Sequence, residues 1–153
     1  MAFQLICSAF KNGEIIPIKH TCNGKNSSPA LIWTGMPENA KSYALILDDP
    51  DAPSGTFVHW VLFDIPAYCT SLPEHIETSA KVPGIGTQGI NDFRHIGYGG
   101  PCPPHGQPHR YFFKLYALDI VINLKAGASK SELEMAMKEH ILAKAQIMGK
   151  FSR

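Results

Sequence analysis

The sequence predicts a mainly β protein: a two-sheet antiparallel β-sandwich with a C-terminal α-helix, in one domain over residues 1–153. Three observations lead to this class. Short apolar runs of strand length recur along the chain, 12 Pro and 13 Gly spread between them supply turns, and one helical pattern lies near the C-terminus. Many short strands with frequent turns and one late helix are typical of a sandwich.

The first half of the chain contains five expected strand segments. Residues 3–9 and 31–33 are short apolar runs, and Pro17 restricts the piece 15–18 to a sheet edge or a bend. Residues 42–47 form an unbroken apolar run that suits a central strand. Residues 57–65 are apolar on both alternating faces, which predicts a strand buried on both sides.

The second half contains an irregular stretch, a long strand and the helix. Residues 71–92 have little periodicity, whereas 111–124 form a third long apolar run that bends near Asp119. Residues 129–149 are expected to be helical, started by a capping box of Ser129 with Glu132 or Ser131 with Glu134 and ended at Gly149. Its apolar face has members at helical spacing: Leu133, Ala136, Met137, His140, Ile141 and Met148.

The charge balance and the absence of targeting patterns restrict the function. Fourteen Lys and Arg against 13 Asp and Glu leave a net charge of +1, so no nucleic-acid partner is expected. No run approaches the roughly 20 apolar residues of a membrane-spanning helix, and no signal peptide is evident, which favours a cytoplasmic protein. The pattern G-x-G-x-x-G at residues 84–89 lacks the flanking strand and helix of a dinucleotide site, and no cofactor is expected.

The four cysteines are expected to be reduced. Cys7, Cys22, Cys69 and Cys102 contain no C-x-x-C pair, and a chain of this length folds without disulfides. We therefore expect thiols that pack as small apolar groups.

The richest candidate stretch is residues 97–116, in which a Gly- and Pro-dense loop leads into an aromatic strand. Proline removes backbone donors and fixes φ, so this loop is expected to be stiff. In the following strand, residues two apart share a face. His109 and Tyr111 are therefore predicted to point the same way, and Arg110 to the opposite side.

Three carboxylates, Asp48, Asp49 and Asp51, follow the apolar run 42–47. Turn chemistry is sufficient to explain Asp48. Carboxylates so close together repel one another, so at least one is expected to have a strong partner. The available donors are His59, His109, Arg110 and Tyr111.

An anion site explains most of this pattern. Two imidazoles and a phenol offer donors to phosphate oxygens, and the Gly99 and Gly100 backbone offers further N–H groups. Two alternatives remain open: two histidines and a carboxylate suit a metal ion, and Cys102 with His105 or His109 suits nucleophilic catalysis.

Together these motifs resemble those of the phosphatidylethanolamine-binding protein (PEBP) family, in its short bacterial, Raf kinase inhibitor-like form. The likeness covers nearly the whole chain and includes weaker matches at residues 16–33 and 116–119. It rests on three elements: Asp49-Pro50-Asp51-Ala52-Pro53; His59-Trp60; and Gly100-Pro101-Cys102-Pro103-Pro104 with His109-Arg110-Tyr111.

The resemblance implies a non-enzymatic protein that binds phosphate-bearing headgroups, such as phosphoethanolamine, or nucleotides. A protein-partner regulator similar to a kinase or protease inhibitor is the alternative, with the pocket as a control site. An exposed edge strand also makes a homodimer an expected arrangement. The implied ligand-binding residues are Asp49, Asp51, His59, Pro101, Pro103, His109 and Tyr111.

Overall fold

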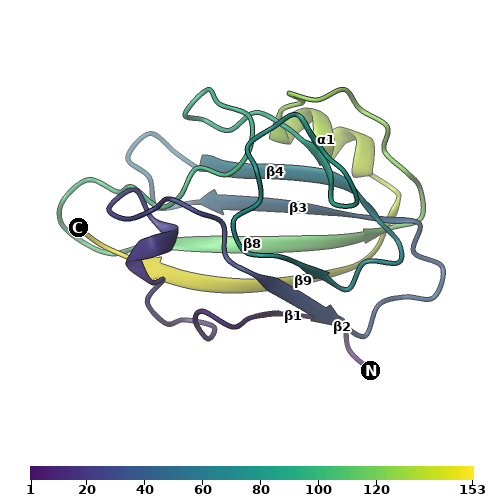
Figure 1. Cartoon of the computed structure of the whole chain (residues 1–153), viewed down its shortest axis with the longest axis horizontal. Coiled ribbons are helices and arrows are strands. Elements are labelled where there is room, and N and C mark those ends of the chain that lie inside the picture. Colours follow the sequence, from purple (N-terminus) through teal and green to yellow (C-terminus); the bar gives the residue numbers. More distant parts are fainter.

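Two antiparallel sheets pack against each other in the computed structural model, which describes residues 1–153 (Figure 1). The smaller sheet has the order β1 (Gln4–Cys7), β2 (Leu31–Thr34), β5 (Ser71–Leu72). The larger sheet has the order β6 (Lys81–Val82), β7 (Gly86–Gln88), β4 (Phe57–Pro66), β3 (Ser42–Asp49), β8 (His109–Leu118), β9 (Ile141–Phe151). A 3₁₀ helix, η1 (Ile18–His20), and one α-helix, α1 (Lys130–Met137), complete the chain. The predicted mainly β sandwich with one C-terminal helix is confirmed.

Each face of the larger sheet covers its own hydrophobic core. The main core, between the two sheets, contains 22 buried residues, including Trp33, Leu45 and Leu62. A second core of nine buried residues, including Val61, lies on the opposite face, which α1 covers over β4 in Figure 1. Residues 57–65 contribute to both cores, so this strand is buried on both sides as predicted.

The helix predicted over residues 129–149 is wrong beyond its first two turns. The capping box of Ser129 with Glu132 starts α1, but the chain leaves the helix after Met137 and passes through Glu139 at a φ of 69°. Residues Ile141–Phe151 then form β9, which pairs along nearly the whole of β8. Long-range pairing with β8 therefore overrides the local helical spacing.

Gly149 is an interior strand residue and not a helix stop. It lies opposite Tyr111 in the β8–β9 ladder. A Cβ added at Gly149 would be 2.5 Å from Cγ1 of Ile16, so the close approach of the neighbouring chain requires glycine here. Ile15 makes one parallel bridge to Lys150, which places the start of the expected segment 15–18 at the edge of β9, whereas Ile18 already begins η1.

The stretch 71–92 is more regular than predicted, because it contains the three short strands β5, β6 and β7. Gln88 anchors it. The Gln88 side chain accepts a hydrogen bond from Nε1 of Trp60 at 2.7 Å and donates to the carbonyls of Glu77 and Ser79 at 2.6 and 2.8 Å. One buried amide thus ties three segments together.

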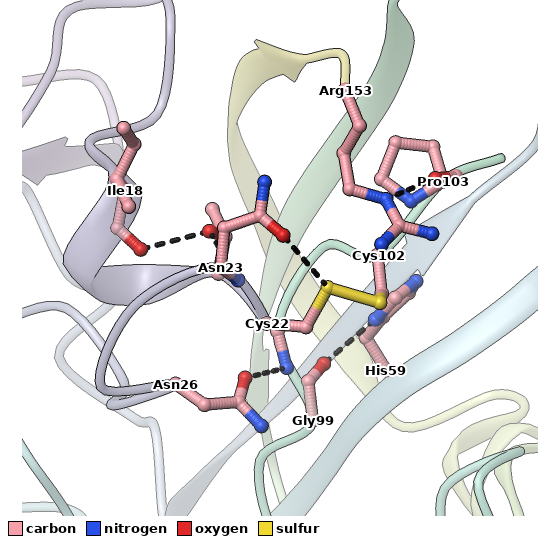
Figure 2. Close-up of a disulfide and its surroundings, with 11 residues drawn as sticks. Ile18, Cys22, Asn23, Asn26, His59, Gly99, Cys102, Pro103 and Arg153 are labelled. Carbon is pink, nitrogen blue, oxygen red and sulfur yellow. Dashed lines mark hydrogen bonds between the residues drawn. A yellow bond between two sulfur atoms is a disulfide. The ribbon is translucent and has the colours of Figure 1, made fainter. Parts of the chain in front are cut away.

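Two of the four cysteines form a disulfide, which corrects the prediction of reduced thiols. Cys22 and Cys102 are bonded, with their Cα atoms 5.3 Å apart (Figure 2). Cys7 and Cys69 are free. The bond joins segments 80 residues apart in the chain. Only the fold brings them together, so cysteine spacing carries no sign of the pairing. None of the helices has the length and apolar character needed to cross a membrane.

Candidate functional site

An open pocket of about 730 Å³ lies where β3, β4 and β8 meet three loops. Its volume is in the range typical of small-molecule sites. The strands contribute Asp49, Phe57, His59, His109 and Tyr111, and the loops contribute residues 52–56, 90–94 and 102–104.

His109 and Asp49 form a largely buried pair at the pocket wall. Nδ1 of His109 lies 2.7 Å from Oδ2 of Asp49, and the two side chains are 13% and 4% exposed. A carboxylate oxygen only accepts, so Nδ1 carries the proton and donates it. This bond fixes the ring orientation and leaves Nε2 for a ligand.

His59 is held in the same tautomer as His109, but by a backbone carbonyl and not by a carboxylate. Its Nδ1 lies 2.6 Å from the Gly99 carbonyl oxygen, so Nδ1 again carries the proton (Figure 2). Burial lowers the pKa of His59, although the Gly99 carbonyl and Asp49 act in the other direction. The ring is therefore neutral at pH 7 and its Nε2 is a hydrogen-bond acceptor. His59 lines the pocket, and no group of the protein makes a hydrogen bond to its Nε2.

Tyr111 forms the floor beside these histidines. The residue is completely buried, and its ring packs edge-to-face with His59 at 5.3 Å between centroids. Burial raises the pKa of Tyr111, and the nearby Asp49 carboxylate raises it further, so the hydroxyl stays protonated. That hydroxyl has no hydrogen-bond partner within the protein. It lies beneath the surface, and a ligand oxygen reaches it only if neighbouring side chains shift.

Asp51 is close to the site but does not line it. Its carboxylate accepts from the backbone N–H, Nε and Nη2 of Arg110 at 3.0, 2.9 and 2.9 Å. The Arg110 guanidinium lowers the pKa of Asp51. As predicted, Arg110 lies on the other face from His109 and Tyr111, and it holds Asp51 there.

Asp48 is also paired, which the turn interpretation did not include. It is the fully buried member of an ion-pair cluster, with Lys114 at 3.1 Å and Lys130 at 2.8 Å. Each of the three neighbouring carboxylates thus has its own cationic or donor partner. The expected repulsion is relieved by directing them to three separate places.

The Pro-rich loop contributes Cys102, Pro103 and Pro104 to the pocket, whereas Pro101 does not line it. The backbone N–H groups of Gly99 and Gly100, expected to face an anion, are both engaged. Gly99 donates to the His59 carbonyl at 2.9 Å, and Gly100 donates to Oδ1 of Asn26 at 2.8 Å. These hydrogen bonds hold the loop and leave no backbone donor there for a ligand.

Sequence reasoning missed an aromatic wall. Phe57 and Phe93 pack edge-to-face with centroids 4.8 Å apart, and each also contacts the His59 ring. Asn91 shapes the loop that presents Phe93, because its Oδ1 accepts from the N–H groups of Phe93 and His95. The adjacent Arg94 has a φ of 66° and lines the pocket. The Asn-Asp pair in this stretch was the one available turn signal.

No group of three or more His, Cys, Asp or Glu side chains has the arrangement of a metal site.

The fold and the pocket define a class: a two-sheet β-sandwich with an open pocket, lined by polar and aromatic side chains, where strands of its larger sheet meet the connecting loops. The model of one family, described as phosphatidylethanolamine-binding protein, matches residues 7–152. The chain belongs to the phosphatidylethanolamine-binding protein family.

Relatives and solved structures agree with this assignment. The chain is 50% identical to a UPF0098 protein of Aquifex aeolicus, covering 98% of this chain and 88% of the relative. It is also 50% identical to one from Methanothermobacter thermautotrophicus, with 95% of each covered. The crystal structure of Escherichia coli YbcL, a member of the PEBP family, superposes with a TM-score of 0.92 at 36% identity, covering 100% and 99% of the two chains. A PEBP homologue from Chlamydia trachomatis gives 0.90 at 38% identity, covering 99% and 98%.

Proposed function

We propose that the pocket binds a small molecule that carries a phosphate group, such as a phosphoethanolamine-like headgroup or a nucleotide, and does not turn it over. The observation that carries this proposal is the buried His109–Asp49 pair. Since Nδ1 of His109 donates to Asp49, a hydrogen bond from Nε2 to a phosphate oxygen requires the imidazolium form. An anion beside the ring favours that form. His109 is therefore the anion-binding group, and Asp49 positions it.

The neutral His59 further defines the ligand. Its Nε2 accepts a hydrogen bond, so it pairs with a protonated phosphate oxygen or with an ammonium group. A ligand with both an oxyanion and a proton to donate satisfies both histidines. A monoprotonated phosphate ester and a phosphoethanolamine headgroup have this character. The aromatic wall of Phe57 and Phe93 gives the rest of the ligand an apolar surface.

Binding without turnover is supported by the surroundings of His109. Nucleophilic catalysis needs a hydroxyl or thiol within hydrogen-bond reach of the base. The hydrogen bond of the His109 ring goes to Asp49, and the sulfur of Cys102 is bonded to Cys22. The Cys–His interpretation therefore loses its nucleophile in this form of the protein.

Calorimetric titration with phosphoethanolamine tests the proposal. His109→Ala removes the donor and should weaken binding by about 1–3 kcal/mol. His105→Ala is the matched control, because His105 is an exposed histidine of the same loop that does not line the pocket. It should bind like the wild type. Equal affinity of all three proteins would contradict the proposal.

A second candidate function, regulation of a protein partner, is favoured by the outer face of β8 and β9. Arg110 lies opposite Lys150, and the Tyr116–Lys144 pair follows on the same face. Arg110 is already paired with Asp51, but the exposed Lys144 and Lys150 of β9 have no carboxylate partner within the protein, so these two cations indicate an anionic partner. Binding of an acidic peptide that Lys144→Glu abolishes would support this candidate.

The homodimer and the cytoplasmic location stay predictions.

A further inference from the structure

We propose that Cys22 and Cys102 are a reversible thiol–disulfide site that controls the anion pocket: the disulfide holds the Pro-rich wall in place, and reduction loosens it. This inference rests on the proposed function of the pocket. It adds a redox input and names the class of reaction partner, a protein or small-molecule dithiol.

The position of the bond makes it accessible. Cys102 lines the pocket of about 730 Å³, and Cys22 lines a neighbouring depression of about 530 Å³. Both residues are partly exposed. The disulfide therefore lies in the partition between two open spaces, where a reductant can approach it. Figure 2 shows it beside the hydrogen bond between His59 and Gly99.

The loop is held differently before and after Cys102. Up to Pro101 it is held by hydrogen bonds: the Gly99 carbonyl accepts from His59, Gly100 donates to Asn26, and the Pro101 carbonyl accepts from the N–H of Cys22 at 3.0 Å. These bonds do not depend on the oxidation state.

Beyond Cys102, support comes from one other residue. Nε of Arg153 donates to the Pro103 carbonyl at 2.7 Å, and the N–H of Gly106 donates to the Arg153 carbonyl at 3.2 Å. The disulfide is the only covalent cross-link, apart from the peptide backbone itself, between this part of the loop and the body of the protein. Reduction therefore loosens the wall formed by residues 102–104, which keeps only the Arg153 hydrogen bonds, and leaves the histidines in place.

The chemistry balances as an ordinary exchange. A thiolate of the dithiol partner attacks one sulfur of the bond, and its second thiolate resolves the mixed disulfide. Cys22 and Cys102 gain two electrons and two protons and become thiols, and the partner becomes a disulfide. In a cytoplasm where glutathione and thioredoxin keep thiols reduced, such a bond is transient and suited to sensing.

Ligand and redox state are coupled in both directions. If the ordered wall strengthens phosphate binding, the bound ligand makes the disulfide harder to reduce by the same factor. Ordering such a segment is expected to change affinity by about 3- to 10-fold. A tenfold change corresponds to a shift of about 30 mV in the midpoint potential of this two-electron couple.

The test combines thiol counting with phosphate titration. Thiols counted after denaturation should number two in the protein treated with oxidised glutathione, from Cys7 and Cys69, and four after dithiothreitol. Inorganic phosphate, titrated by calorimetry, should bind the oxidised form about 3- to 10-fold more tightly. The double variant Cys22→Ser/Cys102→Ser should match the reduced form in either redox buffer. Cys69→Ser, which keeps the disulfide, should respond like the wild type.

The outcomes separate the two proposals. Four thiols after oxidation would overturn the redox site regardless of ligand. Equal phosphate affinity of the two forms would overturn the coupling while the anion pocket stands. Phosphate binding by neither form would overturn both. If the double variant fails to fold, the wild-type comparison in the two redox buffers still decides the matter.

Discussion

Acidification should destabilise this protein through His59. The side chain is only 3% exposed, and burial lowers its pKa from the ordinary value of 6.5. The unfolded chain binds a proton at this position more readily than the folded chain does. The contribution of His59 to the free energy of unfolding is therefore fully present above pH 6.5 and is lost as the pH falls below that value. One proton contributes about 1.4 kcal/mol per pH unit, so His59 alone lowers the free energy of unfolding by up to about 1.4 kcal/mol between pH 7.5 and 5.5.

Urea unfolding of the wild type and His59→Asn at about pH 7.5, 6.5 and 5.5 measures this effect. Asparagine places an N–H near the position of Nδ1, which keeps a donor for the Gly99 carbonyl, and it does not titrate. The other six histidines are the same in both proteins, so whatever they contribute cancels in the difference. The wild type should lose up to about 1.4 kcal/mol more than the variant on acidification. Equal losses of unfolding free energy in the wild type and the variant would refute the assignment of a buried neutral imidazole.

Two further substitutions test the structure around the pocket. Gln88→Leu leaves the buried indole N–H of Trp60 and two carbonyls without their partner, and should cost about 2–4 kcal/mol in urea unfolding; a loss below about 1 kcal/mol would contradict the anchoring role. Asp51→Asn weakens a partly exposed ion pair outside the pocket, so it should cost less than about 1 kcal/mol and leave phosphate affinity within about twofold of the wild type. A large loss of affinity in that variant would restore Asp51 as a ligand.

Two local rules predicted the centre of the site from the sequence. The two-residue period of a strand placed His109 and Tyr111 on one face, and both line the pocket. The repulsion of adjacent carboxylates indicated that they need partners, and Asp49 does pair with His109. Both rules concern residues close together in the chain or groups that cannot remain unpaired. Such arguments need no knowledge of the fold.

The missed features all depend on contacts between distant segments. The apolar residues within 141–151 recur at a spacing that a helix allows, and only pairing with β8 makes this segment a strand. The Cys22–Cys102 bond crosses 80 residues, and Phe93 reaches the pocket from a loop without periodicity. Local pattern sets propensity, but the long-range partner decides between nearly equal local states.

In the proposed site His109 donates a hydrogen bond to the ligand and His59 accepts one. These two roles predict that the pocket distinguishes phosphate from sulfate. A phosphate monoester near neutral pH retains a proton in part, because its second pKa is about 6, and inorganic phosphate holds this proton more firmly, whereas sulfate has none. Nε2 of the neutral His59 needs a donor, and a sulfate oxygen placed there would bring two lone pairs together. Sulfate should therefore bind the oxidised protein at least about 10-fold more weakly than phosphate, measured by competition at about pH 6.5 and constant ionic strength. His59→Asn, which loses the acceptor at Nε2, should reduce the difference between the phosphate and sulfate affinities. Equal competition by the two anions in the wild type would mean that His59 faces the ligand as a donor.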